Sequence, residues 1–141
     1  MTVLCFDASS GKSTQAFTKR IRNWSLAPNG DFIAFSGTDS QQNVLQLRST
    51  TTGQERDIRI EGHGGVMNVD WAADGKTILI STADAEPGRS LLRVGLDGSV
   101  TVLLQHNNSV IIGTLGSPDG CSLAVAEFHR GPTTVWARDL F

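Results

Sequence analysis

Three glycine-containing turns recur along this chain at one fixed interval. They read PNG at 28–30, ADG at 73–75 and PDG at 118–120, so each step is 45 residues. A second pair of glycines, Gly53 and Gly98, has the same 45-residue spacing. Short strands that repeat every 40 to 50 residues or so are typical of propeller blades, in which one four-stranded sheet is the repeating unit. The repeat therefore predicts an all-β chain.

Each turn separates two apolar segments that are expected to be strands. Asn-Gly and Asp-Gly pairs are typical of tight hairpins in which both residues take positive φ. Gly30, Gly75 and Gly120, with Asp74 and Asp119, are therefore predicted as structural turn residues. Alternation and turn spacing predict strands near residues 2–7, 13–18, 21–27, 32–36, 43–48, 56–60, 66–72, 77–82, 90–95, 99–104, 110–116, 121–126 and 133–138.

These strands group into about three four-stranded blades of a β-propeller. The blades are expected at roughly 21–60, 66–104 and 110–141, while the strands within 2–18 belong to a neighbouring blade. Three blades do not close a ring by themselves, and the third blade lacks its fourth strand. We therefore expect a homodimer that completes one ring, in which residues 13–18 of each chain complete the last blade of the other.

The string DASSGKST at 7–14 ends like a phosphate-binding P-loop, but its context differs. A P-loop needs a glycine where this chain has Phe6, and a helix must follow the loop. The segment instead aligns with VLQLRSTTTGQ and LLRVGLDGS, two stretches that contain the second pair of glycines. We interpret it as the loop between the third and fourth strands of a blade, with Lys12 exposed.

Bulk properties exclude several classes of partner. Charged residues make up 18% of the chain and the net charge is -2, whereas a nucleic-acid surface needs a basic stripe. The cluster of Lys19, Arg20 and Arg22 is expected to be a solvated connection. Neither a long apolar run nor a signal sequence is present. We therefore expect a soluble protein with no nucleic-acid or membrane partner, cytoplasmic by default and periplasmic if it is part of a longer chain.

The residues that could carry chemistry are scattered. The histidines lie in loop contexts without metal-ligand spacing, and no Gly-x-Ser-x-Gly elbow occurs. Asp70 and Asp74 are too few for a calcium loop. We therefore predict no catalytic, cofactor or metal site, and interpret Cys5 and Cys121 as buried free thiols. The residues predicted as rim contacts are His63, Arg89, His129 and Arg130.

Two tryptophans precede their turns by similar distances. Trp24 and Trp71 are therefore expected at equivalent positions of adjacent blades, filling the wedge between them.

The repeats SLAPNGDFIAFSG, DWAADGKTILIST and GSPDGCSLAVAEF resemble the PD40 repeat of TolB-like six-bladed β-propellers. They also look like the C-terminal propellers of bacterial regulatory proteins, which follow a winged-helix or serine/threonine kinase domain. The resemblance covers residues 3–141, although Pro-Asp-Gly is intact only at 118–120. It implies a six-bladed ring, of which this chain supplies about half and the homodimer the whole. It leaves function open, because the same blade occurs in TolB, in peptidase propellers and in regulatory tails.

The predicted loops differ in sequence although the strands match. They read GTDSQQN from Gly37, ADAEPGRS from Ala83 and EFHRGPTT from Glu127. Variable loops on a constant frame are typical of an interaction surface. We therefore expect a non-catalytic scaffold that binds an unknown protein or small ligand. The alternative is the propeller portion of a peptidase or lyase, which would gate a catalytic domain or carry a metal.

Overall fold

A computed structural model of the chain describes residues 2–6, 8–38, 43–84, 88–106, 109–129 and 134–139. These ranges contain thirteen strands and no helix, which confirms the all-β prediction and every predicted strand. The strands are β1 (Thr2–Phe6), β2 (Ser13–Thr18), β3 (Ile21–Leu26), β4 (Phe32–Gly37), β5 (Val44–Ser49), β6 (Glu55–Arg59), β7 (Gly65–Trp71), β8 (Thr77–Asp84), β9 (Gly88–Gly95), β10 (Val100–His106), β11 (Ser109–Gly116), β12 (Ser122–His129) and β13 (Thr134–Asp139). It follows that no helix within these ranges could cross a membrane.

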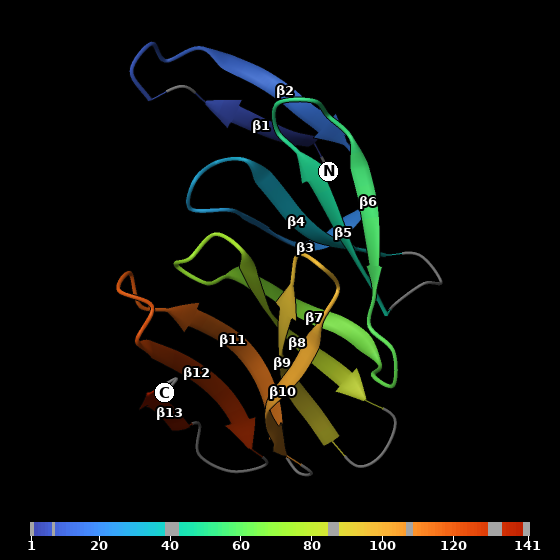
Figure 1. Cartoon of the computed structure of the whole chain (residues 1–141), viewed down its shortest axis with the longest axis vertical. Coiled ribbons are helices and arrows are strands. Elements are labelled where there is room, and N and C mark those ends of the chain that lie inside the picture. The colour runs from blue at the N-terminus through green and yellow to red at the C-terminus, as the bar shows by residue number, and fades with distance from the viewer. Residues whose placement is uncertain are drawn as a thin grey trace.

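The strands form four antiparallel sheets in chain order. β1 and β2 form the N-terminal hairpin, β3 to β6 the first sheet, β7 to β10 the second sheet, and β11 to β13 the third sheet. Figure 1 shows the sheets fanning out, with the hairpin and the third sheet at opposite ends. The leading strands β3, β7 and β11 lie next to one another. This is the arrangement of propeller blades around an axis, and it makes the chain a partial propeller.

The turn after each leading strand is built differently from the predicted hairpin. In the first sheet, the Gly30 N–H donates to the Ala27 carbonyl at 2.8 Å, so Pro28 and Asn29 are the central residues. Pro28 has φ fixed at about −65°, and Gly30, the fourth residue, is left-handed with φ 77°. The positive φ predicted for Gly30 is therefore confirmed, but Gly30 is not one of the two central residues of the turn. The corresponding bonds, at 3.1 and 2.9 Å, run from Gly75 to Ala72 and from Gly120 to Ser117.

Apolar faces of successive sheets pack against each other and form the core. Ala34, Leu45 and Leu47 of the first sheet meet Ile78 and Leu92 of the second in one buried cluster. A further cluster joins the second and third sheets, and another joins the hairpin to the first sheet. Each sheet therefore depends on its neighbours to bury its side chains.

Trp71 fills the wedge between the first and second sheets. Its indole is 5% exposed, and Nε1 donates to the Ser25 carbonyl oxygen at 3.0 Å. Trp24 is 47% exposed and does not hold the equivalent place. Strand pairing matches Trp71 with Ile78 and Leu26 with Ile33, so Leu26 is the counterpart of Trp71. The expected equivalence of Trp24 and Trp71 is therefore wrong. Trp71 lies four residues before Gly75 but Trp24 lies six before Gly30, so the 45-residue interval also matches Trp71 with Leu26.

Each leading strand contains a bulge at the same repeat position, which the sequence analysis missed. The register shifts between Ile21 and Asn23, and at the matching places in β7 and β11. Beside the first bulge, the Asn23 amide donates to the Met67 carbonyl oxygen of the next leading strand. A bulge bends its strand and increases the local twist. The repeated bulges thus sit where adjacent leading strands are joined.

We expect Gly75→Val to lower the free energy of unfolding by about 1 to 3 kcal/mol, because Gly75 is left-handed at φ 62° and a β-branched residue is strained there. The matched control is Gly113→Val in β11, where an added Cβ has nothing within 4 Å and φ is not positive. Urea denaturation measures both. Equal stability of Gly75→Val and the parent would contradict the turn geometry.

Candidate functional site

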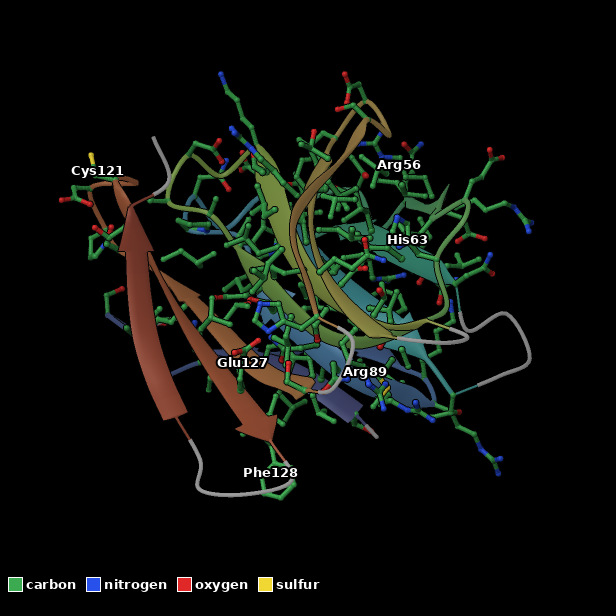
Figure 2. All side chains as sticks on the ribbon, turned by 90° about the horizontal axis from the view of Figure 1, so that it is seen from below. Arg56, His63, Arg89, Cys121, Glu127 and Phe128 are labelled. Atoms are coloured by element: carbon green, nitrogen blue, oxygen red, sulfur yellow. The ribbon has the colours of Figure 1, made fainter. Side chains whose placement is uncertain are left out.

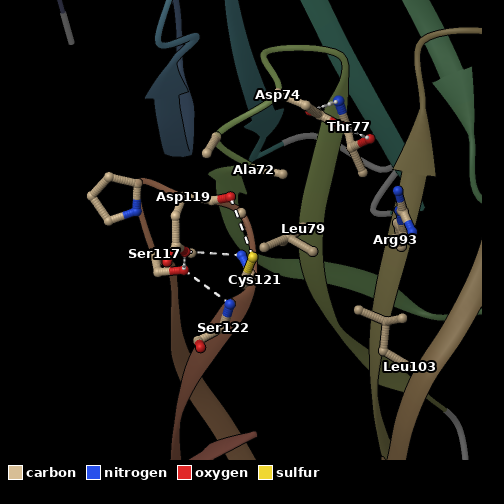
Figure 3. Close-up of a pocket in the computed structure, with 14 residues that line it drawn as sticks. Ala72, Asp74, Thr77, Leu79, Arg93, Leu103, Ser117, Asp119, Cys121 and Ser122 are labelled. Atoms are coloured by element: carbon tan, nitrogen blue, oxygen red, sulfur yellow. Dashed lines mark hydrogen bonds between the residues drawn. The ribbon is translucent and has the colours of Figure 1, made fainter. Parts of the chain in front are cut away.

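A pocket of about 370 Å³ opens between the second and third sheets, at the end where the leading strands turn. Its apolar lining includes Ala72, Leu79 and Leu103, and Arg93 adds a positive charge. Figure 3 shows Leu79 between the turn of the third sheet and Arg93. This volume is at the lower end of the range for ligand pockets, which are mostly apolar with a few polar groups.

One wall of the pocket is the turn of the third sheet. The Asp119 carboxylate accepts hydrogen bonds from the Ser117 hydroxyl and, at 2.9 Å, from the Cys121 N–H. The Ser117 oxygen accepts the Ser122 N–H at 2.9 Å. The bonds from Ser117 and Cys121 lower the pKa of Asp119 below its ordinary value. This wall therefore carries a negative charge at neutral pH.

The facing wall is the turn of the second sheet. Asp74 Oδ1 accepts the N–H groups of Lys76 and Thr77 at 2.8 and 2.9 Å, and Oδ2 accepts the Thr77 hydroxyl at 2.7 Å. Partial burial raises the pKa of Asp74, but these hydrogen bonds and the charge of Arg93 outweigh it, so the pKa is lowered. The two aspartates chosen as turn residues thus both lie at the pocket rim.

Cys121 also lies at the rim, as an exposed free thiol. The prediction of a buried thiol is therefore wrong for Cys121, because the residue follows the turn and precedes β12. The side chain of Cys5 lies outside the described residues.

The pocket exists because a glycine replaces the wedge-filling tryptophan. Gly116 pairs with Leu123 as Trp71 pairs with Ile78, so the two residues hold equivalent places in their sheets. A Cβ added at Gly116 would point toward Ala72 and Leu79, both of which line the pocket, with its nearest contacts at 3.8 Å. The wedge that an indole fills between the first two sheets is therefore open between the second and third.

Two of the predicted rim contacts, His63 and Arg89, lie at the other end of the sheets. His63 precedes β7 and Arg89 lies near the start of β9. Figure 2 shows Cys121 of the pocket rim and Phe128 at opposite ends of the third sheet. His129 ends β12, but its side chain, like the whole of Arg130, is outside the described residues. The structure therefore does not bring His63 or Arg89 to the pocket.

A contact between His106 and the buried carboxylate of Glu127 lies near Arg89 and was not predicted. His106 Nδ1 lies 2.8 Å from Glu127 Oε1, and the Ser109 hydroxyl donates to the same oxygen at 3.1 Å. His106 faces Arg89 in the β9–β10 pairing. Among the residues that the structure describes, no three His, Cys, Asp or Glu side chains group as metal ligands would. Glu127 was named in the sequence only as the start of a loop, whereas it lies inside β12.

No protein-family model and no curated protein sequence matches this chain. Solved structures do match it over nearly its whole length. A candidate TolB from Agrobacterium tumefaciens superposes with a TM-score of 0.80 over 99% of this chain at 17% identity. TolB from Acinetobacter baumannii gives 0.79 over 99% at 19% identity. The fold is that of a TolB-like β-propeller.

The TolB-like fold is present here only in part. The chain covers 53% of the Agrobacterium protein and 35% of the Acinetobacter protein. A chain of the nidogen–laminin complex, at 14% identity, also matches, with a TM-score of 0.73, 97% of this chain covered and 53% of that chain. Proteins of different kinds thus share this arrangement, so function has to be argued from this chain's own site.

We expect Asp74→Asn to make unfolding less dependent on pH in the acid range. Because the folded pKa of Asp74 is lowered, its ionised form stabilises the fold fully above the unfolded value of 3.8, and this stabilisation is lost as pH falls through the folded pKa. Denaturation at several pH values between neutrality and about pH 3 measures the effect. The parent should exceed Asp74→Asn in stability at neutral pH, and the difference should shrink on acidification. A difference that grows on acidification would contradict the shift.

Proposed function

We propose that this chain is a non-catalytic binding module of the TolB-like propeller type. The observation that carries the proposal is the pocket between the second and third sheets, where apolar walls meet polar groups from two turns. Leu79 and Leu103 offer surface that a ligand can cover, while Asp74, Asp119 and Arg93 offer charges that can orient it. The occupant is a protein segment or a small ligand.

The alternative is a propeller portion of a peptidase or lyase that gates a catalytic domain or carries a metal. A hydrolase and lyase screen, together with elemental analysis of the purified protein, separates the two readings. If the chain is a non-catalytic module, we expect the screen to show no turnover and the elemental analysis to show no stoichiometric metal. Turnover, or one metal ion bound for each chain, would overturn the proposal.

We further propose that a second copy of the chain covers the open face of the first sheet. Trp24 and Leu26 on this face are each 47% exposed, whereas their counterparts Val69 and Trp71, which face the first sheet, are each 5% exposed. The N-terminal hairpin covers another part of the face, where Val3 and Phe17 form one buried cluster with Ile21, Ile33 and Phe35. Phe17 packs against Phe35 with ring centroids 5.1 Å apart, and Lys19 pairs with Glu55 of β6 at 2.7 Å. Trp24 and Leu26 stay exposed, so the face has room for another sheet there.

The third sheet has the complementary open face. Leu115 is 68% exposed there, and Phe128 is also exposed on the side turned away from the second sheet. Ala124 lies opposite Leu115 on the same face. The counterpart of Ala124 in the second sheet is Leu79, which is buried because the third sheet covers it. Apolar side chains in such a row favour association with another sheet.

A homodimer would cover both faces of each chain. The chain covers 53% of the Agrobacterium protein, which supports the proposal that two copies would supply the blades of one six-bladed ring. In this proposal β2 of each chain completes the third sheet of its partner. β1 then leaves the ring or lies at its rim, because it takes the same blade position as β13. Two identical contacts about a two-fold axis close without forming fibres.

We expect light scattering to show a dimer for the parent and a monomer for Leu115→Asp, because a charge on the covered face opposes docking. The matched control is Val102→Asp. Val102 is also exposed, but it lies on β10 at the edge of the second sheet, away from both open faces. This control should remain a dimer, and deletion of residues 1–19 should abolish the dimer. A folded parent monomer at micromolar concentration would contradict the half-ring.

The chain resembles the propellers of bacterial regulatory proteins, in which the propeller follows a winged-helix or kinase domain. We propose that this chain recognises a ligand or partner in a protein of this kind. The full coding frame tests the setting, because it shows directly whether such a domain precedes residue 1.

A further inference from the structure

We propose that the pocket between the second and third sheets binds a planar aromatic group that carries an N–H donor and is about the size of an indole. This inference rests on the proposed binding function and names the chemistry that the pocket recognises. It is drawn from a comparison of the two wedges within this one chain.

The first wedge shows which shape the sheets enclose. There the indole of Trp71 is held between two sheets in one buried cluster with Ala27 and Ala34. Its ring nitrogen donates to the Ser25 carbonyl oxygen at 3.0 Å. A flat apolar ring with one donor at its edge therefore satisfies the wedge.

The second wedge has the same frame without the ring. Gly116 stands in the place of Trp71, Ala72 in the place of Ala27, and Leu79 in the place of Ala34. Leu79 is larger than Ala34 and takes up part of the space, yet about 370 Å³ stays open. That volume holds an indole together with the first atoms of the group that carries it.

A hydrogen-bond acceptor is expected at the matching place. Asp70 holds the repeat position of Ser25, since Asp70 pairs with Leu79 as Ser25 pairs with Ala34. The Asp70 carbonyl oxygen therefore corresponds to the oxygen that accepts the Trp71 N–H. Asp70 is not among the residues that line the open pocket, so an occupant meets this oxygen when its ring inserts as deeply as the indole of Trp71 does in the first wedge. An aliphatic occupant would leave this contact unused.

The rim adds a preference for the part of the occupant outside the wedge. Asp74 and Asp119 place two carboxylates at the mouth and Arg93 places one guanidinium there. Both carboxylates already accept hydrogen bonds within their turns. The Arg93 side chain is exposed on β9, so its guanidinium is the charged group that can contact the occupant. A carbonyl or carboxylate next to the aromatic ring would accept hydrogen bonds from the Arg93 guanidinium.

Two variants that each introduce a tryptophan into β11 distinguish the effect of filling the pocket from a general disturbance of the third sheet. Gly116→Trp places an indole where Trp71 has one, and an added Cβ there makes only ordinary contacts. Gly113→Trp places the same side chain on the same strand, at a position with nothing within 4 Å and outside the pocket lining. Gly116→Leu is a smaller second variant, should Gly116→Trp fail to fold.

The probes are N-acetyltryptophanamide, free indole and N-acetylleucinamide, titrated into 15N-labelled protein. We expect N-acetyltryptophanamide to shift the amide signals of Leu79, Leu103 and Cys121, and N-acetylleucinamide to bind more weakly. Gly116→Trp should weaken N-acetyltryptophanamide binding at least about tenfold, a loss of about 1.4 kcal/mol, while Gly113→Trp should leave it unchanged. Binding of N-acetyltryptophanamide as well as indole identifies a tryptophan side chain of a polypeptide as the natural occupant. Binding of indole alone identifies a free heteroaromatic molecule.

Absence of binding by both aromatic probes to the folded parent would overturn the inference. So would equal binding of N-acetyltryptophanamide to Gly116→Trp and the parent, or equal binding of the leucine and tryptophan amides. These outcomes leave the wider proposal standing, since that proposal falls on turnover or stoichiometric metal, which the titration does not measure.

Discussion

Each sheet of this chain has two apolar faces, and it can bury neither of them by itself. Ile33 and Phe35 of β4 point to one side of the first sheet, and Ala34 points to the other. Stacking the sheets in order resolves this constraint for every inner face, and it leaves one face open at each end of the stack. The bulges, the crossing hydrogen bonds and the buried tryptophan all lie at these sheet-to-sheet contacts.

The sequence predicted the frame well because its signals are local. A glycine turn, an apolar strand and a 45-residue interval each depend on neighbouring residues, and together they were enough to predict all thirteen strands and the partial propeller. The turn was mistaken only in its central residues. The glycine of each pair was expected at the centre, whereas Gly30 and Gly75 are both the fourth residue, whether or not the turn contains a proline.

The candidate site was not predicted, because a missing side chain gives no signal of its own. Gly116 has no positive φ and no turn motif, so nothing in its immediate sequence marks it. Strand pairing places it opposite Leu123, as Trp71 lies opposite Ile78, and the 45-residue interval leads from Trp71 to the same position. The sequence analysis compared only the tryptophans and so matched Trp71 with Trp24. His63 and Arg89, which were chosen from loops, lie at the other end of the sheets.

The first and second sheets are packed together more completely than the second and third. A buried indole with a hydrogen bond fills the space between the first two sheets, whereas the second and third have a glycine and a void at that point. Side chains around a void lose contacts that a filled joint provides, so separating the third sheet costs less free energy than separating the first sheet from the second. Local opening follows the weakest contacts. The amide protons of β11 and β12 should therefore exchange with solvent before those of β7 and β8. An occupant bound between the second and third sheets would stabilise their contact and slow this exchange.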